Sequence, residues 1–192
     1  MTLQKVRKVV IVGGGTAGWV SAATLARVLG PLVRIELVES EEIGTVGVGE
    51  ATIPQIRLLL GVLGIQEDDF LRHTNGTIKL GIQFNGWSQP GHSYMHAFGA
   101  VGRSLGLIPF HPYWLRAREN GDRSGLWDYS FNYQAAAAGR FDRVQADPRQ
   151  GLDALVYAFH FDATLVARYL RVYAERLGVT RTEGRIVGTR LR

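Results

Sequence analysis

Two absences narrow the class of protein. The 192-residue sequence has no cysteine, which excludes a disulfide framework, a thiolate nucleophile and thiolate metal ligands. It also has no apolar run long enough to span a bilayer, and its first residues lack the apolar segment of a secretion signal. We therefore expect a cytoplasmic protein that is neither secreted nor inserted in a membrane.

A concentrated block of charge is also missing. The formal net charge is +5, and the arginines that produce it are scattered along the chain. Nucleic-acid-binding proteins gather lysine and arginine in a stripe with interleaved aromatic residues, and no such stripe occurs. We expect neither a nucleic-acid nor a membrane partner, and the charge favours small anionic molecules instead.

Glycine, by contrast, is abundant, and three glycines form a motif directly after an apolar run. Residues 9–18 read VVIVGGGTAG, with Gly13, Gly15 and Gly18 in GxGxxG spacing. Between a strand and a helix, this motif holds the pyrophosphate of a dinucleotide. Gly13 permits the tight turn, Gly15 lets the backbone approach the phosphates, and Gly18 lets the helix pack close to the strand. The alternative is a glycine-rich turn without a ligand, which the flanking strand and helix disfavour.

The residues around the motif predict a βαβ unit. The run at 9–12 is typical of a central parallel strand, and a second strand at 33–38 finishes at Glu39. A carboxylate there accepts a ribose hydroxyl and disfavours a 2′-phosphate, so FAD or NAD fits better than NADP. Between the strands, helical spacing predicts a helix whose buried face is formed by Val20, Leu25, Val28 and Leu29.

Further elements follow with less regular patterns. Helices are predicted at 54–63 and 66–73, and residues 77–84 alternate as one half-buried strand. Its apolar face would carry Ile78, Leu80, Ile82 and Phe84, and its other face Lys79, Gly81 and Gln83. Glycine, proline and aromatic residues make 85–112 a long irregular connection. The remaining predictions are helices at 112–119, within 126–138 and at 162–177, and strands at 179–182 and 186–191.

Five sequence blocks carry a resemblance to a known family. They are GGGTAGW at 13–19, GVGEATIP at 47–54, TIKLGIQFNGW at 77–87, YMHAFG at 94–99 and FHFDATLVARYL at 159–170. In this order they resemble the flavin-dependent tryptophan halogenases. The resemblance covers nearly the whole chain but only the N-terminal part of the family pattern. The WxWxIP signature of halogenases, and the glutamate that works with the family's lysine, do not occur here.

The resemblance implies a fold and a domain plan. The fold would be α/β, a Rossmann-like FAD-binding domain of the flavin monooxygenase type with an inserted, partly irregular segment on the substrate side. Residues 1–60 would form the βαβ unit and a strap, 61–150 the insert with the lysine-bearing strand, and 151–192 the return to the FAD-binding domain. Because a doubly wound domain needs more parallel strands than this chain supplies, we expect the domain to be incomplete.

The resemblance also implies a chemistry. Reduced FAD (FADH2), delivered by a separate flavin reductase, would react with O2 and oxidise a halide, chloride or bromide, to hypohalous acid. This acid would move through a tunnel to a lysine, which positions it or forms a haloamine, and the halogen would then add to tryptophan or another electron-rich ring. By match to the block at 77–87, that lysine is Lys79. From the pattern alone, a solvated lysine on an outer strand face is the competing interpretation.

Site residues follow from the motif and the resemblance together. His96 and Phe98 would point the same way in an extended segment and hold an aromatic substrate by stacking, with ordinary loop packing as the alternative. No metal site is expected, because His92 and His96 lack an acidic partner and lie among helix-breaking residues. The residues assigned to cofactor binding are Gly13, Gly15, Thr16, Ala17, Gly18, Glu39, Gly47, Val48, Gly49 and Ala51.

The roles of two residues and two alternatives for the whole chain stay open from the sequence. Glu50 can act in catalysis, but it can equally cap the helix that begins near Pro54, so no catalytic role is assigned to it. Trp19 can pack on the sheet or under a cofactor. The chain can also belong to another flavin monooxygenase, a hydroxylase in which Lys79 is only structural. Finally, it can be a catalytically silent, truncated dinucleotide-binding fragment with open sheet edges.

Overall fold

The computed structural model describes residues 5–43, 49–147, 149, 151–188 and 190. These residues form two compact units, one within 1–77 and 159–192 and the other within 78–158. The chain leaves the first unit within β4 (Thr77–Lys79) and returns within β7 (Ala158–Asp162). The boundaries between these compact units thus fall at 77/78 and 158/159, whereas the domain plan expected from the sequence has its boundaries at 60/61 and 150/151.

A parallel three-stranded sheet, in the order β1-β2-β8, supports the first unit. β1 (Lys8–Val12) and β8 (Thr180–Glu183) pair with opposite edges of β2 (Arg34–Glu39). The strands predicted at 9–12, 33–38 and 179–182 are therefore confirmed. The central position predicted for the first strand is wrong within the described residues, because β2 takes it and β1 lies at the edge. Val10 and Val12 of β1 are exposed, and they lie on the face of the sheet opposite to that of the buried Leu37.

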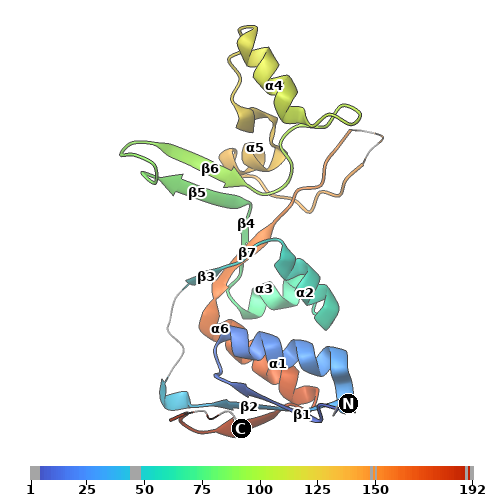
Figure 1. Ribbon diagram of the computed structural model, residues 1–192, viewed down its shortest axis with the longest axis vertical. Coiled ribbons are helices and arrows are strands. Elements are labelled where there is room, and N and C mark those ends of the chain that lie inside the picture. The colour runs from blue at the N-terminus through green and yellow to red at the C-terminus, as the bar shows by residue number, and fades with distance from the viewer. Residues whose placement is uncertain (1–4, 44–48, 148, 150, 189, 191–192) are drawn as a thin grey trace. The chain divides into compact units, whose positions relative to one another are not determined.

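Two helices lie side by side on one face of this sheet, α1 (Thr16–Leu29) and α6 (Ala163–Arg176) (Figure 1). The predicted buried face of α1 is wrong, since Val28 is 64% exposed. The buried residues of α1 are Trp19, Ala22, Ala23 and Ala26, and those of α6 are Ala163, Val166, Ala167, Leu170 and Ala174. Alanines on both helices allow a close approach, so packing rather than side-chain hydrophobicity selects the buried face.

The rest of the first unit packs on these two helices, with α2 in contact with α1 and α3 in contact with α6. β3 (Gly49–Ala51) pairs antiparallel with β7, and α2 (Gln55–Leu63) and α3 (Glu67–His73) follow it in the chain. The two helices confirm the predictions at 54–63 and 66–73. The ring of Phe70 on α3 packs against those of Phe159, Phe161 and Tyr169, and this cluster ties α3 to β7 and α6. Short 3-10 turns occupy Gly30–Leu32 and Glu41–Ile43.

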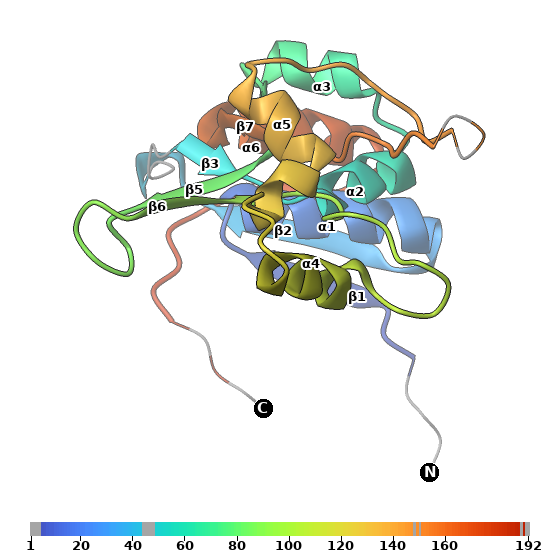
Figure 2. The same cartoon turned by 90° about the horizontal axis from the view of Figure 1, so that it is seen from above.

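In the second unit, β5 (Gly81–Asn85) and β6 (Ser93–Ala97) form an antiparallel hairpin, and α5 (Phe131–Ala137) packs against it (Figure 2). The single strand predicted at 77–84 is wrong, because β4 ends at Lys79 and β5 begins at Gly81. The irregular connection predicted at 85–112 is also wrong, since it contains β6. α4 (Phe110–Glu119) and the 3-10 turn Leu126–Tyr129 agree with the predicted helices.

Two further sequence predictions can be compared with the described residues. The strand predicted at 186–191 is wrong for residues 186–188 and 190, which form no strand; the others lie outside the description. The helix predicted at 162–177 is confirmed by α6, which begins where the Asp162 side chain accepts hydrogen bonds from the backbone N–H groups of Thr164 and Leu165. No helix in the described part of the chain combines the length and the apolar character needed to cross a membrane.

Candidate functional site

The glycine motif forms a tight turn between β1 and α1. Gly13 has φ +108°, a conformation that favours glycine, and its N–H donates to the carbonyl of Val38 at 2.9 Å. Gly15 precedes α1 without a side-chain cap, so the first N–H groups of the helix have no side-chain acceptor there. A Cβ on Gly18 would lie 2.0 Å from the carbonyl oxygen of Gly13, which explains why the helix can pack so closely on the turn.

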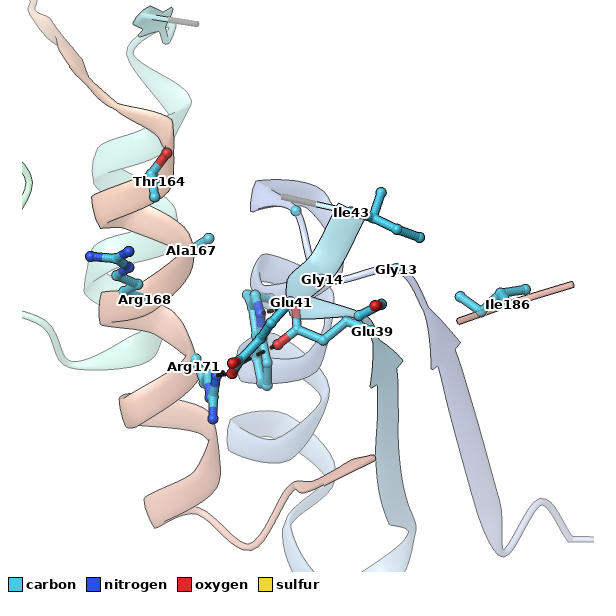
Figure 3. A pocket seen from close by; sticks show the side chains of 13 residues that line it. Gly13, Gly14, Glu39, Glu41, Ile43, Thr164, Ala167, Arg168, Arg171 and Ile186 are labelled. Carbon is cyan, nitrogen blue, oxygen red and sulfur yellow. Dashed lines mark hydrogen bonds and ion pairs between the residues drawn. The ribbon is translucent and has the colours of Figure 1, made fainter. Parts of the chain in front are cut away.

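A cleft of about 850 Å³ opens at the carboxyl ends of β1 and β2 (Figure 3). Its volume is typical of a site for a small molecule or cofactor. The glycine turn forms one wall, and α6 forms the opposite wall. The lining side chains come from four segments: Trp19, Glu39, Ser40, Glu41, Ile43, Thr164, Ala167, Arg168, Arg171 and Ile186, beside Gly13, Gly14 and Gly15.

Glu39 is held in this cleft by groups from three elements. Its Oε1 accepts a hydrogen bond from Nε of Arg181 on β8 at 2.7 Å, and its Oε2 accepts one from Nε1 of Trp19 on α1 at 3.4 Å. Nη1 of Arg171 on α6 lies 3.8 Å from Oε1. The hydrogen bond to Glu39 raises the pKa of the Arg181 guanidinium. Trp19 is 1% exposed, so it packs in the core and also lines the cleft.

Sequence reasoning missed Gly14, the middle glycine of the turn. A Cβ on Gly14 would lie 1.3 Å from Oε2 and 2.6 Å from Cβ of Glu39. The Glu39 side chain therefore occupies the space that any other residue at position 14 would need. Arg171 and Arg181 were missed as well, because only the pairing of β2 with β8 and the packing of α6 bring them to Glu39.

These residues fit an anionic dinucleotide. The hydroxyl oxygen of Thr16, in the first turn of α1, is buried and has no hydrogen-bond partner in the described part of the chain. Around Gly15, the space that a Cβ would occupy is open. A helix N-terminus with uncapped N–H groups, an open glycine and a hydroxyl donor is a pyrophosphate-binding arrangement. Ala17 and Gly18 are in the same first turn.

The second block assigned to the cofactor is only partly described. Gly47 and Val48 lie outside the described residues, whereas Gly49 and Ala51 belong to β3. Ala51 lines a separate, apolar cavity of about 470 Å³ with Thr16 and Glu50. The capping role considered for Glu50 is wrong, because Glu50 lies in β3 and the N-cap of α2 is Pro54, without a side-chain cap.

Lys79 is buried at the end of β4, with an exposed fraction of 7%. Its Nζ lies 5.6 Å from the centroid of the Phe98 ring. Burial lowers the pKa of the ammonium group, because the charged form loses hydration. The alternative of a solvated lysine on an outer face is therefore wrong. The predicted division of faces is wrong too, since Ile78 and Leu80 are less buried than the lysine between them.

The two aromatic candidates have different neighbours. Phe98 lies beside Lys79, and its N–H donates to the carbonyl of Leu80 at 2.8 Å. His96 is exposed on β6, with its ring centroid 6.5 Å from that of Trp127. His96 thus belongs to the hairpin rather than to an irregular loop, and Phe98 follows the end of β6.

Asn132 is a polar residue of this unit that the sequence did not reveal. It is 2% exposed, and its side-chain amide donates to the carbonyls of Leu80 and Val156 and accepts from the N–H of Val156 at 3.1 Å. These bonds join α5 to the residue after Lys79. Within the described residues, no group of three potential metal ligands comes together.

Comparisons with known proteins identify relatives of this chain. The family model described as "Tryptophan halogenase" matches residues 8–192. Tryptophan 6-halogenase SttH from Streptomyces toxytricini is 36% identical, over 96% of this chain and 38% of SttH. The structures of two flavin-dependent halogenases superpose well. Xcc4156 from Xanthomonas campestris has a TM-score of 0.89 at 43% identity, and BrvH from Brevundimonas sp. BAL3 has 0.87 at 44%.

Coverage is strongly asymmetric in all three cases. Both structural matches include 98% of this chain but 37% of the matched chain. The chain thus spans less than two-fifths of the length of the relatives that it matches. The expected α/β, Rossmann-like fold is confirmed for the part that is described.

Proposed function

Because the matching model runs over residues 8–192, the chain belongs to the tryptophan halogenase family, and we propose that it forms the N-terminal portion of a flavin-dependent halogenase. The substrate class we propose is an electron-rich aromatic ring, tryptophan or another indole. The observation that carries the proposal is the burial of Lys79, an amine with a lowered pKa beside an aromatic ring, in a chain that also has a dinucleotide-binding turn.

In this proposal the cleft of the first unit holds FAD. Backbone N–H groups of the glycine turn and the Thr16 hydroxyl would bind the pyrophosphate, and Glu39 would accept a hydrogen bond from the ribose. When bound in reduced form, the flavin supplies, with O2, the oxidising power that converts chloride or bromide to hypohalous acid. A separate flavin reductase would deliver the reduced cofactor.

Lys79 would then bind the hypohalous acid and transfer its halogen to the aromatic ring. Its ammonium form can hydrogen-bond hypohalous acid, and its neutral form can attack the halogen, with formation of an N–halogen bond and release of water. Transfer of the halogen to the ring regenerates the amine, and the ring loses a proton. Because desolvation favours the neutral amine, burial makes the second route accessible at a lower pH than it would be for an exposed lysine.

Phe98 and His96 would contact the aromatic substrate. Phe98 already lies against the reactive amine, so a ring stacked on it would be close to the halogen donor. The two substitutions Phe98→Ala and His96→Ala test this assignment, and we expect both to raise KM for the aromatic substrate without changing FAD affinity.

A hydroxylase remains the rival function. It would use the same cofactor but insert oxygen directly into the substrate, without a role for the buried amine. The deciding experiment incubates the full-length protein that carries residues 1–192 with reduced FAD, O2, an indole and either chloride or bromide. A halide-dependent, halogenated product supports the proposal, whereas a hydroxylated product that forms without halide contradicts it.

A further inference from the structure

The carboxylate of Glu39 is fixed by side chains from β8 and α1, and the pairing of β2 with β8 explains how they reach it. In the parallel pair of β2 and β8, Leu37 is opposite Arg181 and Glu39 is opposite Glu183. Leu37 is completely buried under the helices. Side chains alternate along a strand, and neighbours in register share a face. Glu39, Arg181 and Glu183 therefore line the helix-covered side of the sheet, at its carboxyl edge.

Arg181 is the most buried cation at this edge. Its side chain is 13% exposed, against 33% for Arg171. Nε of Arg181 donates to Oε1 of Glu39 at 2.7 Å, Nη2 lies 3.0 Å from Glu41, and Nη2 also bonds Glu183. A planar guanidinium with fixed donor directions holds a carboxylate in one orientation better than a flexible ammonium group does.

The two carboxylate oxygens of Glu39 consequently have different surroundings. Oε1 is occupied by Arg181, with Arg171 at 3.8 Å. Oε2 lies over the glycine turn, 1.3 Å from the position that a Cβ on Gly14 would take, and within the described residues it accepts the 3.4 Å hydrogen bond from Trp19 alone. Figure 3 shows Glu39 reaching from the end of its strand into the cleft.

We propose that Arg181 is a positioning residue for the dinucleotide: by holding Oε1 of Glu39, it presents Oε2 to the 2′-hydroxyl of the adenosine ribose. This inference rests on the proposed binding of FAD. It adds a residue of β8, far from the glycine motif in sequence, to the determinants of cofactor recognition. It also makes the carboxylate rigid before the cofactor arrives, so that no ordering of Glu39 opposes binding.

The test compares FAD with the analogue whose adenosine ribose lacks the 2′-hydroxyl. Dissociation constants are measured by flavin fluorescence with the full-length protein that carries residues 1–192. We expect the wild type to bind FAD about tenfold more tightly than the analogue, as for a hydrogen bond to a charged group. In Arg181→Met, FAD affinity should fall to that of the analogue, and the affinity for the analogue should change by less than about threefold.

Arg171→Met is the charge-matched comparison. Arg171 also lines the cleft, so its loss can weaken binding of FAD and of the analogue, but the short bond between Arg181 and Glu39 stays. The affinities for FAD and the analogue should therefore fall by the same factor, and the ratio between them should be kept. If both variants lose the preference equally, charge rather than orientation is responsible and the proposal is overturned. The double variant Arg181→Met with Glu39→Gln should show no further loss of preference beyond Arg181→Met alone.

Circular dichroism and thermal unfolding show whether Arg181→Met folds. If it does not, Arg181→Lys replaces it, and a full preference for FAD in that variant overturns the need for a guanidinium. Equal affinity of the wild type for FAD and the analogue overturns the inference but leaves flavin binding intact. Failure of the wild type to bind FAD at all overturns the proposed function, and the inference with it.

Discussion

The ammonium nitrogen of Lys79 lies 5.6 Å from the centroid of the Phe98 ring, within the second unit. Contact with an aromatic face favours the charged form of a lysine, whereas removal from water favours the neutral form. The pKa of Lys79 is lowered by desolvation, so the second effect is the larger. This amine is therefore accessible in its nucleophilic form at a lower pH than a surface lysine.

We expect Lys79→Met to lower the rate of halogenation by at least about 100-fold, because in the proposed mechanism this amine acts directly on the halogen. FAD affinity should not change, since Lys79 does not line the cofactor cleft. Product analysis and a flavin titration measure the two effects. Lys8→Met is the control: Lys8 pairs with Glu36 on the sheet, and its loss should spare halogenation. Retained halogenation in Lys79→Met would remove this residue from the mechanism.

The lowered pKa of Lys79 predicts how stability depends on pH. In the interval between the folded pKa and the ordinary value of 10.5, the unfolded chain binds more protons at Lys79 than the folded chain does. The free energy of unfolding therefore rises with pH in this interval, relative to Lys79→Met, and the penalty for burying the charge is fully present below it. Urea unfolding of both proteins at pH values from about 7 to about 10 measures the difference. A difference that does not change with pH would contradict the burial of an ionisable amine.

Two glycines of the same motif should respond differently to alanine. Gly18→Ala places a Cβ 2.0 Å from the carbonyl oxygen of Gly13, and we expect it to lower the free energy of unfolding by about 1–3 kcal/mol. Gly15→Ala meets no atom within 4 Å and keeps an ordinary φ of −71°, so stability should change by less than about 0.5 kcal/mol. FAD affinity should nevertheless fall at least about tenfold in Gly15→Ala, because the Cβ blocks the approach of the phosphates. Normal FAD binding by Gly15→Ala would contradict the proposed position of the pyrophosphate.

The hydrogen bonds of the buried Asn132 should stabilise the second unit. Asn132→Ala leaves the carbonyl of Leu80 with one donor fewer and both backbone groups of Val156 without these partners, which should cost about 2–4 kcal/mol. Asn120→Ala is the matched control, since the exposed Asn120 side chain donates only to the carbonyl of Arg116 and its loss should cost less than about 1 kcal/mol. Chemical denaturation compares the two. Equal losses would show that the buried amide is no more important than a surface one.

Elements of the first unit that depend on local sequence patterns were predicted correctly. The strand, glycine turn, helix and second strand were all predicted, and Glu39 was placed at the end of its strand. Such elements depend on residues close together in the chain, namely β-branched runs, a glycine that requires a positive φ, and helix-ending residues. The buried face of α1 was wrong for the same reason, because the face that packs is selected by α6, more than 130 residues later.

The second unit shows the opposite case. Alternation predicted one continuous strand through Lys79. The strand is instead interrupted at Leu80, because the residues from Gly81 onward pair with β6. No local pattern reveals that a Cβ on Gly81 would lie 2.6 Å from the carbonyl oxygen of His96, or that Asn132 bonds the carbonyl of Leu80. These contacts join segments 15 to 52 residues apart.

The sequence by itself determined the α/β class and the glycine turn between strand and helix, because both depend on residue types at fixed short spacing. Its resemblance to the halogenase family, and not spacing, identified Lys79 as the candidate amine. Only the tertiary structure decided that the amine is buried, that the Phe98 ring lies beside it, and that Arg181 holds Glu39. Burial and side-chain orientation arise when distant segments exclude water from one another, and that exclusion is a property of the packed chain and not of any short stretch of it.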